Sequence, residues 1–227
     1  MRIIATTAFV ALTLGAGCTR HLTDNEARFA HDLFGDTIET DSIEVLAGAG
    51  LTPLPYETPQ QKSARAEAAK APPRKAPEDI CVRKPSPRKY AWSWPAAFVL
   101  ENNVYLAYRF YAKDAFAGVY EGSVPYPLAQ LMAHELVHVW QWQNRDITDY
   151  TPEKSGSESV KSRDPYYWVG KEGREFLSYG YEQQAAIIED FVCYALLDPQ
   201  DAKLDEIASI LRPVLPVDRF LNALGGR

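Results

Sequence analysis

The chain has 227 residues, of which 46% are hydrophobic and 12% are aromatic. This length and composition are sufficient for a single domain with a sizeable hydrophobic core. The net charge of −6 is unfavourable for contact with nucleic-acid phosphates, so we expect no nucleic-acid partner. Basic residues do gather over 62–89, but prolines interrupt them, which is typical of a solvated linker.

Residues 1–17 have the pattern of a secretory signal peptide. Arg2 supplies a positive start, an apolar run follows over 3–14, and small residues at 15–17 precede Cys18. The run is too short to cross a membrane as a helix. Small residues directly before a cysteine resemble a bacterial lipoprotein processing site, so we expect lipidated Cys18 to attach the protein to a membrane. Simple secretion is the alternative, and either outcome predicts an exported bacterial protein, periplasmic or anchored to the outer membrane.

The next part of the chain predicts one helix and one strand. Thr23 and Glu26 match a capping box, which predicts a helix over 24–34. Gly35 is suited to ending that helix. A short strand is expected over 38–46.

Residues 52–95 contain nine of the sixteen prolines. We interpret this segment as a proline-rich insertion or linker within a single domain over 18–227. It contains Cys81, and the only other cysteine besides Cys18 is Cys193. In an oxidising periplasm these two could form a disulfide. The alternative is that Cys193 is a small buried hydrophobe and Cys81 a free thiol.

Two strands and a buried helix are predicted next. Residues 96–100 and 104–110 predict strands joined by a turn. A helix is predicted over 127–143, with a proline in its first turn. Its central part carries no charge apart from Glu135, so it is apolar nearly all round, as buried helices are.

The HExxH motif lies within this helix, as His134-Glu135-Leu136-Val137-His138. Its two imidazoles are one helical turn apart on the same face, where both can bind one zinc ion. Glu135 then lies beside the remaining coordination position, where a water would bind. Two histidines and a carboxylate in an apolar helix are costly unless paired, and a metal would pair them. The alternative is a buried helix whose histidines bond to neighbouring backbone groups.

The remaining chain predicts a loop, a hairpin and two helices. The polar stretch 144–163 predicts a surface loop, and 166–179 predicts a hairpin with an exposed turn. An apolar stripe after Gly180 predicts a helix that ends before Asp198. A last amphipathic helix is expected over 202–211.

A catalytic zinc site needs a third protein ligand and keeps one position open. The other two histidines, His21 and His31, lie far upstream in a polar segment, which favours a carboxylate. Glu182, in the first turn of the predicted downstream helix, is the ligand that we predict. Glu189, two turns further on roughly the same face, is the alternative ligand. Asp190 could instead orient a ligating histidine.

These motifs resemble a known family. The gluzincin-type zincin metallopeptidases share the pattern seen here in HELVHVWQWQ and, about forty residues later, YEQQAAIIEDF. More narrowly, the chain resembles bacterial Vgr-related proteins and the metallopeptidase-like domains encoded near contractile injection systems. Residues 22–38 are similar to the segment that opens that domain. The chain departs from the thermolysin-like NExxSD pattern, because position 186 is alanine.

The resemblance implies an α+β, zincin-like fold. In such a fold a small sheet packs on the buried HExxH helix and on a following helix that carries a ligand. The resemblance implies zinc held by His134, His138 and Glu182, with Glu135 as the catalytic base. In zincins the sheet edge beside the metal helix binds extended substrate, which assigns that role to 104–110.

We therefore expect a zinc-dependent peptidase of the cell envelope that hydrolyses a peptide or protein substrate through a zinc-activated water. Tyr179 or Tyr181 could donate a hydrogen bond to the oxyanion, and packing is the alternative role for both. A second possible function is a zinc-stabilised, non-catalytic module of a secretion or envelope system. A third is a peptidoglycan-binding envelope protein with an exposed aromatic groove away from the histidines.

Overall fold

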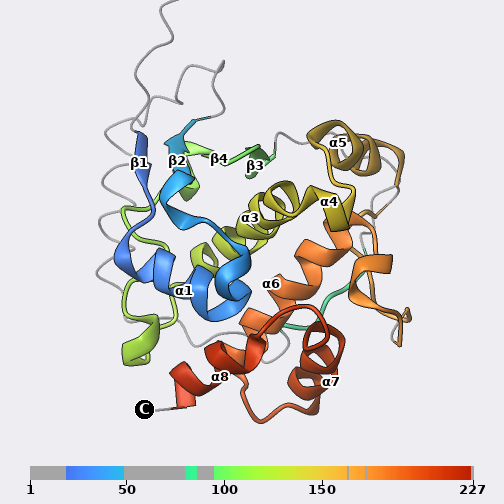
Figure 1. Cartoon of the computed structure of the whole chain (residues 1–227). Coiled ribbons are helices and arrows are strands. Elements are labelled where there is room, and N and C mark those ends of the chain that lie inside the picture. Colours follow the sequence, from blue (N-terminus) through green and yellow to red (C-terminus); the bar gives the residue numbers. More distant parts are fainter. Residues whose placement is uncertain (1–18, 49–79, 86–94, 163, 172, 226–227) are drawn as a thin grey trace, which may run out of the picture.

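The computed structural model describes five stretches of the chain: 19–48, 80–85, 95–162, 164–171 and 173–225. The predicted signal peptide and the predicted lipidation at Cys18 lie outside the described residues. So does most of the proline-rich segment 52–95. The described residues form an α+β structure with seven α-helices and a four-stranded mixed sheet, which confirms the predicted fold class (Figure 1).

The sheet contains β1 (Thr19–His21), β2 (Glu44–Ala47), β3 (Ala97–Leu100) and β4 (Asn103–Leu106). Its order is β1-β2-β4-β3, with β2 parallel to β4 and the other pairs antiparallel. The hairpin of β3 and β4 is confirmed, although β4 ends earlier than predicted. The prediction that 104–110 forms a sheet edge is wrong, because β4 is an inner strand. The edge strand in contact with the HExxH helix is β3.

The segment before β2 is not the strand predicted over 38–46. A 3-10 turn forms at Thr40–Ser42, and β2 starts only at Glu44. The side chain of Gln143 bonds both backbone groups of Glu39, accepting from its N–H at 2.7 Å and donating to its carbonyl at 3.1 Å. Because these backbone groups are already paired, the stretch does not need a strand partner.

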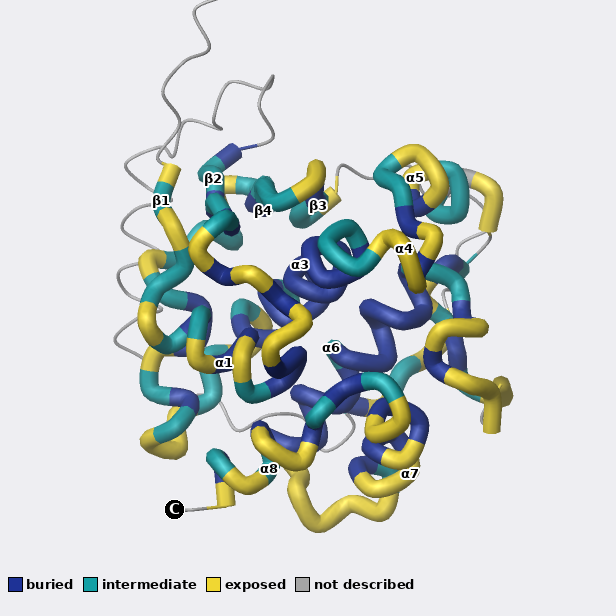
Figure 2. The backbone as a smooth tube through the Cα atoms, in the orientation of Figure 1, coloured by how far each residue is buried: buried dark blue, intermediate teal, exposed yellow. Residues whose placement is uncertain are grey.

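Five of the helices are α1 (Asp24–Phe34), α3 (Leu128–Gln143), α6 (Tyr181–Leu197), α7 (Ala202–Leu211) and α8 (Val217–Gly225). α1 begins at the predicted capping box of Thr23 and Glu26. α3 lies between the sheet and α6, and both helices are buried along most of their length (Figures 1 and 2). The predicted burial of the HExxH helix is therefore confirmed. Among the described residues, no helix combines the length and apolar character needed to cross a membrane.

The C-terminal helix α8 is missing from the sequence prediction. Its Val217, Phe220 and Leu224 are buried, and the helix packs against α1. The Phe220 ring meets Phe29 edge-on, with 5.2 Å between the ring centroids. The three- and four-residue spacing of these apolar side chains is the signal that could have identified the helix.

The polar stretch 144–163 is not the predicted loop, because it contains α4 (Arg145–Thr148) and α5 (Pro152–Lys161). The Thr151 hydroxyl caps α5 by accepting from a backbone N–H of its first turn at 3.3 Å, and Pro152 suits the first helical position. α5 packs against α6. The N-terminal cap and the packing against α6 thus stabilise a helix in a sequence that has no apolar stripe.

The hairpin predicted over 166–179 is also wrong, since no strand forms in the described part of this segment. Trp168 and Phe176 are buried, and a 3-10 turn forms at Phe176–Ser178. The Gln183 side chain of α6 donates to a backbone carbonyl of the segment at 2.8 Å. Two of the aromatic residues that suggested strands, Trp168 and Phe176, instead pack in the core.

A disulfide joins the described stretch 80–85 to α6. The sulfurs of Cys81 and Cys193 are 2.11 Å apart, so the predicted pairing is confirmed. The bond links two residues that are 112 positions apart in the sequence, and it places 80–85 alongside α6.

Candidate metal centre

Helices α3 and α6 bring the three predicted ligands together. His134, His138 and Glu182 are all buried, and one ligand atom from each lies within 4.8 Å of the others. The histidines share a face of α3 because they are four positions apart, and Glu182 meets them from the first turn of α6. The three side chains form a group that could hold a metal ion.

The carboxylate of Glu182 lies at the same distance from both histidine rings. Glu182 Oε2 lies 3.4 Å from His134 Nε2 and 3.4 Å from His138 Nε2. These separations are longer than the usual N–H···O hydrogen bond of about 2.9 Å. Ligand atoms that surround a tetrahedral ion at about 2.0–2.1 Å lie about 3.3–3.4 Å from one another. The two observed separations are therefore compatible with ligand atoms that share one ion.

His138 is oriented by its own helix. Its Nδ1 lies 2.8 Å from Gln141 Oε1, three positions along α3. The Gln141 amide nitrogen donates to the Tyr181 carbonyl and to Gln184 Oε1. Because the Gln141 oxygen must then act as an acceptor, Nδ1 of His138 carries a proton, and in the neutral ring the lone pair of Nε2 is available to a metal ion.

His134 is oriented by a side chain of α6. Its Nδ1 lies 3.4 Å from Glu189 Oε2, and the same oxygen accepts from Arg83 Nη2 at 2.9 Å. Glu189 therefore lies behind the ring rather than beside Nε2, and it is not one of the three grouped ligands. Asp190, which the sequence suggested as an orienting residue, pairs instead with Arg83 and Trp168.

The second carboxylate oxygen of Glu182 is held by α5. Ser155 Oγ donates to Glu182 Oε1 at 2.7 Å and Ser159 Oγ donates at 3.0 Å. Glu158, between them in sequence, accepts from the backbone N–H of Tyr181 at 2.8 Å, which satisfies a free amide at the start of α6. The segment that was predicted as a loop thus fixes the carboxylate ligand.

The charges within the group stabilise one another. Burial alone would raise the pKa of Glu182, but the two histidines outweigh burial and hold that pKa well below its usual range. Burial would likewise lower the pKa of His134, but hydrogen bonds to Glu182 and Glu189 raise that pKa to about 10. The pKa of His138 is also raised, against the effect of burial, by Glu182. The metal-free site therefore attracts protons, and a bound cation would replace them.

Glu135 is the buried acid next to this group on α3. Among the described residues, its Oε2 has no hydrogen-bond partner. Burial raises the pKa of Glu135, although the charges of His134 and His138 act in the opposite direction. An unpaired buried oxygen costs roughly 1–3 kcal/mol, and a water at the metal would satisfy it.

Two tyrosines without a sequence motif of their own lie against the histidines. The Tyr150 ring is 5.8 Å from the His138 ring, and the Tyr166 ring is 5.7 Å from the His134 ring. Tyr150 is buried, whereas Tyr166 is 40% exposed. Burial raises the pKa of both tyrosines, so both hydroxyls stay protonated at neutral pH and can donate hydrogen bonds. No sequence spacing links them to the motif, so only the tertiary structure identifies them.

The two tyrosines predicted as oxyanion donors have other partners. The Tyr179 hydroxyl donates to the Lys171 carbonyl at 2.7 Å, and the Tyr181 hydroxyl donates to the Asp149 carbonyl at 2.8 Å. In the structure each hydroxyl proton is therefore directed to a backbone carbonyl and not to the metal centre.

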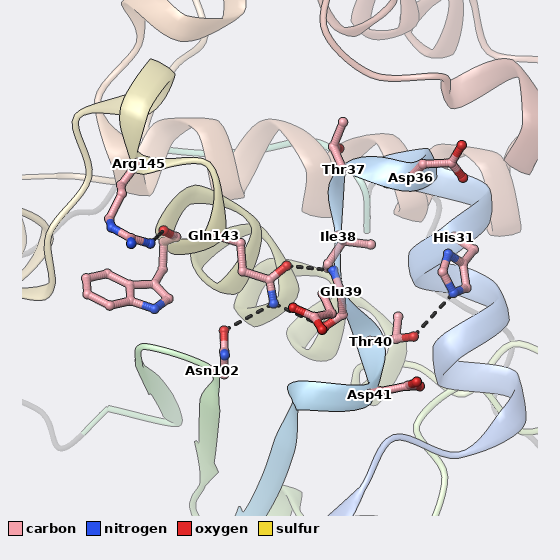
Figure 3. A pocket seen from close by; sticks show the side chains of 11 residues that line it. His31, Asp36, Thr37, Ile38, Glu39, Thr40, Asp41, Asn102, Gln143 and Arg145 are labelled. Carbon is pink, nitrogen blue, oxygen red and sulfur yellow. Dashed lines mark hydrogen bonds between the residues drawn. The ribbon is translucent and has the colours of Figure 1, made fainter.

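A cavity of about 640 Å³ lies between the segment before β2 and the C-terminal end of α3 (Figure 3). Its lining includes three exposed acids and, across from them, an aromatic and a basic side chain: Asp36, Glu39, Asp41, Trp142 and Arg145. Within the described residues, Trp142 is its only tryptophan, tyrosine or phenylalanine. No residue of the metal centre lines this cavity, so it is a separate feature and not an aromatic groove.

The donor set itself fits a divalent metal. It combines two imidazole nitrogens with one carboxylate oxygen, and each ligand is held by a further hydrogen bond or ion pair. No protein-family model, curated protein or solved structure matches the chain, so the site is interpreted from its own geometry.

Proposed function

We propose that this protein is a zinc-dependent peptidase whose active site is formed by His134, His138, Glu182 and Glu135. The observation that carries the proposal is the buried Glu135 Oε2, which has no partner in the described part of the chain and lies next to the ligand group. In a site that only stabilised the fold, an unpaired carboxylate oxygen would be a cost without a compensating role. A hydrolytic site needs such a base within reach of the attacking water.

Zinc is the metal that suits this donor set best. Two imidazole nitrogens with one carboxylate oxygen are typical of catalytic zinc, which keeps a fourth position for water. Mg²⁺ and Ca²⁺ prefer oxygen ligands throughout. The 3.4 Å separations between the Glu182 oxygen and the two ring nitrogens are compatible with this choice.

The protein side chains divide the remaining work. When bound, zinc supplies an acidified water and polarises the scissile carbonyl. Glu135 would accept the proton of the attacking water at its free Oε2 and pass it to the leaving amine. Tyr166, partly exposed beside His134, would donate a hydrogen bond to the carbonyl oxygen as negative charge develops there.

Glu135→Gln tests the proposed chemistry. Glutamine keeps the size of the side chain but cannot take up the proton. We therefore expect the variant to retain one zinc per chain and to lose hydrolysis by about 10²- to 10⁴-fold. Elemental analysis measures the zinc, and a fluorescence-quenched peptide library measures cleavage. Glu206→Gln is the matched control, because Glu206 is an exposed acid on α7 paired with Lys203.

Two outcomes would contradict the peptidase. Equal cleavage by wild type and Glu135→Gln would remove the carboxylate from the mechanism. Zinc-loaded wild type that cleaves no peptide in the library would favour the non-catalytic, zinc-stabilised module instead.

The location in the cell envelope is part of the same proposal. It is supported by the signal-peptide pattern at 1–17 and by the disulfide between Cys81 and Cys193, because disulfides persist in oxidising compartments. Lipid attachment is proposed at Cys18. Cell fractionation of the chain labelled with a fatty-acid probe tests both points.

A further inference from the structure

The described stretch 80–85 reaches the metal centre through Arg83. We propose that Arg83 is a positioning residue of this centre: it holds Glu189 against His134, and the disulfide of the same stretch holds Arg83 in place. The inference rests on the metal site of the proposed function, but not on catalytic activity at that site.

One oxygen atom links Arg83 to a metal ligand. Glu189 Oε2 accepts from Arg83 Nη2 at 2.9 Å and lies 3.4 Å from His134 Nδ1. The Glu189 side chain is 33% exposed, so packing alone does not select its rotamer. An ion pair to a fixed guanidinium supplies that restraint and keeps the carboxylate behind the histidine ring.

Arg83 is itself fixed by several charged hydrogen bonds. Its Nε donates to Asp190 at 2.9 Å and its Nη2 donates to Asp190 at 2.7 Å. Asp190 also accepts from Trp168 Nε1 at 2.8 Å. The Arg83 side chain is only 17% exposed and that of Asp190 only 8%. A buried ion pair with this many hydrogen bonds has one favourable geometry. The guanidinium is therefore held in one position, from which it pairs with Glu189.

The disulfide attaches Arg83 to the helix that carries both acids. Cys81 is two residues before Arg83, and Cys193 is three residues after Asp190, about one helical turn. The bond spans 112 residues of sequence, so it raises the effective concentration of the guanidinium at Glu189. The disulfide and the ion pair with Asp190 therefore both stabilise the contact between Arg83 and Glu189.

The consequence for metal binding passes through the His134 ring. A carboxylate at the Nδ1 proton fixes the ring orientation and makes Nε2, the nitrogen that faces the other ligands, more basic. Without Arg83 the Glu189 side chain can turn toward solvent, and His134 loses both effects. Loss of such a partner lowers metal affinity by about 10- to 100-fold.

The test measures zinc affinity of the full-length chain by competition with a chromophoric chelator, together with the visible spectrum of the Co²⁺-substituted protein. Arg83→Gln should bind zinc about 10- to 100-fold more weakly and should shift the Co²⁺ absorption bands. Arg83→Lys keeps the charge but not the planar fork, so its affinity should lie between those of Arg83→Gln and wild type. Arg212→Gln is the matched control, because Arg212 forms an exposed pair with Asp218, and it should behave as wild type.

Further variants separate positioning from folding. Glu189→Gln should weaken zinc binding by itself, and adding Arg83→Gln should weaken it little more, because both changes act on one contact. Replacing Cys81 and Cys193 together by serine should weaken binding in the same direction. Thermal unfolding checks that each variant is folded. If Arg83→Gln does not fold, Glu189→Gln and Arg83→Lys decide the question by the same affinity measurement.

Wild-type zinc affinity and a wild-type Co²⁺ spectrum in folded Arg83→Gln protein would overturn the proposal. A lower unfolding temperature without a change in affinity would overturn it too, because that result indicates a structural role only. Zinc binding without peptidase activity in the wild type would refute the proposed function but leave this affinity comparison valid. Failure of the wild type to bind either zinc or Co²⁺ would overturn both.

Discussion

The two histidine ligands are oriented in different ways. His138 is held at 2.8 Å by Gln141, a neutral side chain three positions along the same helix. His134 is held at 3.4 Å by Glu189, a charged side chain of another helix, which in turn pairs with Arg83 from a distant stretch. One ligand therefore depends on local helix geometry, and the other depends on tertiary structure and a disulfide.

Burial explains why the two sides differ. Gln141 is fully buried and both ends of its amide have partners, so packing and hydrogen bonds fix its orientation. Glu189 is partly exposed and needs its ion pair to remain in place. The His138 side of the centre is thus the more rigid, and the His134 side is the one that distant parts of the chain can influence.

The largest expected effect comes from removing one of the two histidine ligands. His138→Ala should lower zinc affinity by more than about 10³-fold and should lower the unfolding temperature in excess zinc. The reason is that Glu182 stays buried without one of its two histidine partners. Elemental analysis and thermal unfolding with and without a chelator measure both effects. His31→Ala, at an exposed histidine of α1, is the control; a full zinc content in His138→Ala would contradict the site.

Gln141→Leu removes the hydrogen bond that orients His138 from its own helix. Leucine has a similar volume, but it leaves the His138 Nδ1 proton and the Tyr181 carbonyl without this partner. We expect a loss of about 2–4 kcal/mol in the free energy of unfolding, and zinc affinity about 10- to 100-fold lower. Chemical denaturation and chelator competition are the measurements.

The matched change on the other side is Glu189→Gln. It should lower zinc affinity but change the free energy of unfolding by less than about 1 kcal/mol, because the Glu189 side chain is one-third exposed (33%). If the free energies of unfolding fell equally in Gln141→Leu and Glu189→Gln, the distinction between a rigid and an adjustable side would be wrong.

Proton release gives the smallest and finest test of the comparison. In the metal-free protein, hydrogen bonds to Glu182 and Glu189 outweigh burial and raise the pKa of His134 to about 10, so this ring is protonated at pH 7. Zinc must displace that proton, so we expect at least about one proton to be released for each zinc ion bound at pH 7. The apparent zinc affinity should therefore rise with pH. Calorimetry in buffers of different ionisation enthalpy counts the protons.

Glu189→Gln sharpens the same measurement. The variant lacks one of the groups that raise the pKa of His134, so that pKa should move down toward its ordinary value. A smaller fraction of the rings then carries a proton at pH 7, and zinc binding should release fewer protons than in wild type. Equal proton release in both proteins would show that Glu189 has no electrostatic influence on His134.

Local periodicity explains which features could be predicted from the sequence. His134 and His138 fall on one face of any helix because they are four positions apart. The apolar flanks predicted that this helix is buried, and Glu182 was identified as a carboxylate in the first turn of the next apolar helix. The helix α1 with its capping box and the β3–β4 hairpin also follow from local patterns, whereas the α+β class was implied by the family resemblance.

Only the tertiary structure decided what surrounds the ligands. Ser155 and Ser159 hold Glu182 from a polar segment that has no apolar stripe, Tyr166 comes from a segment predicted as a hairpin, and Arg83 comes from the proline-rich segment. A side chain that orients a ligand needs a single contact at the right distance, and such a contact has no period along the chain. Helical spacing therefore determined which residues can bind a metal, whereas long-range packing and a disulfide determined which residues hold them in position.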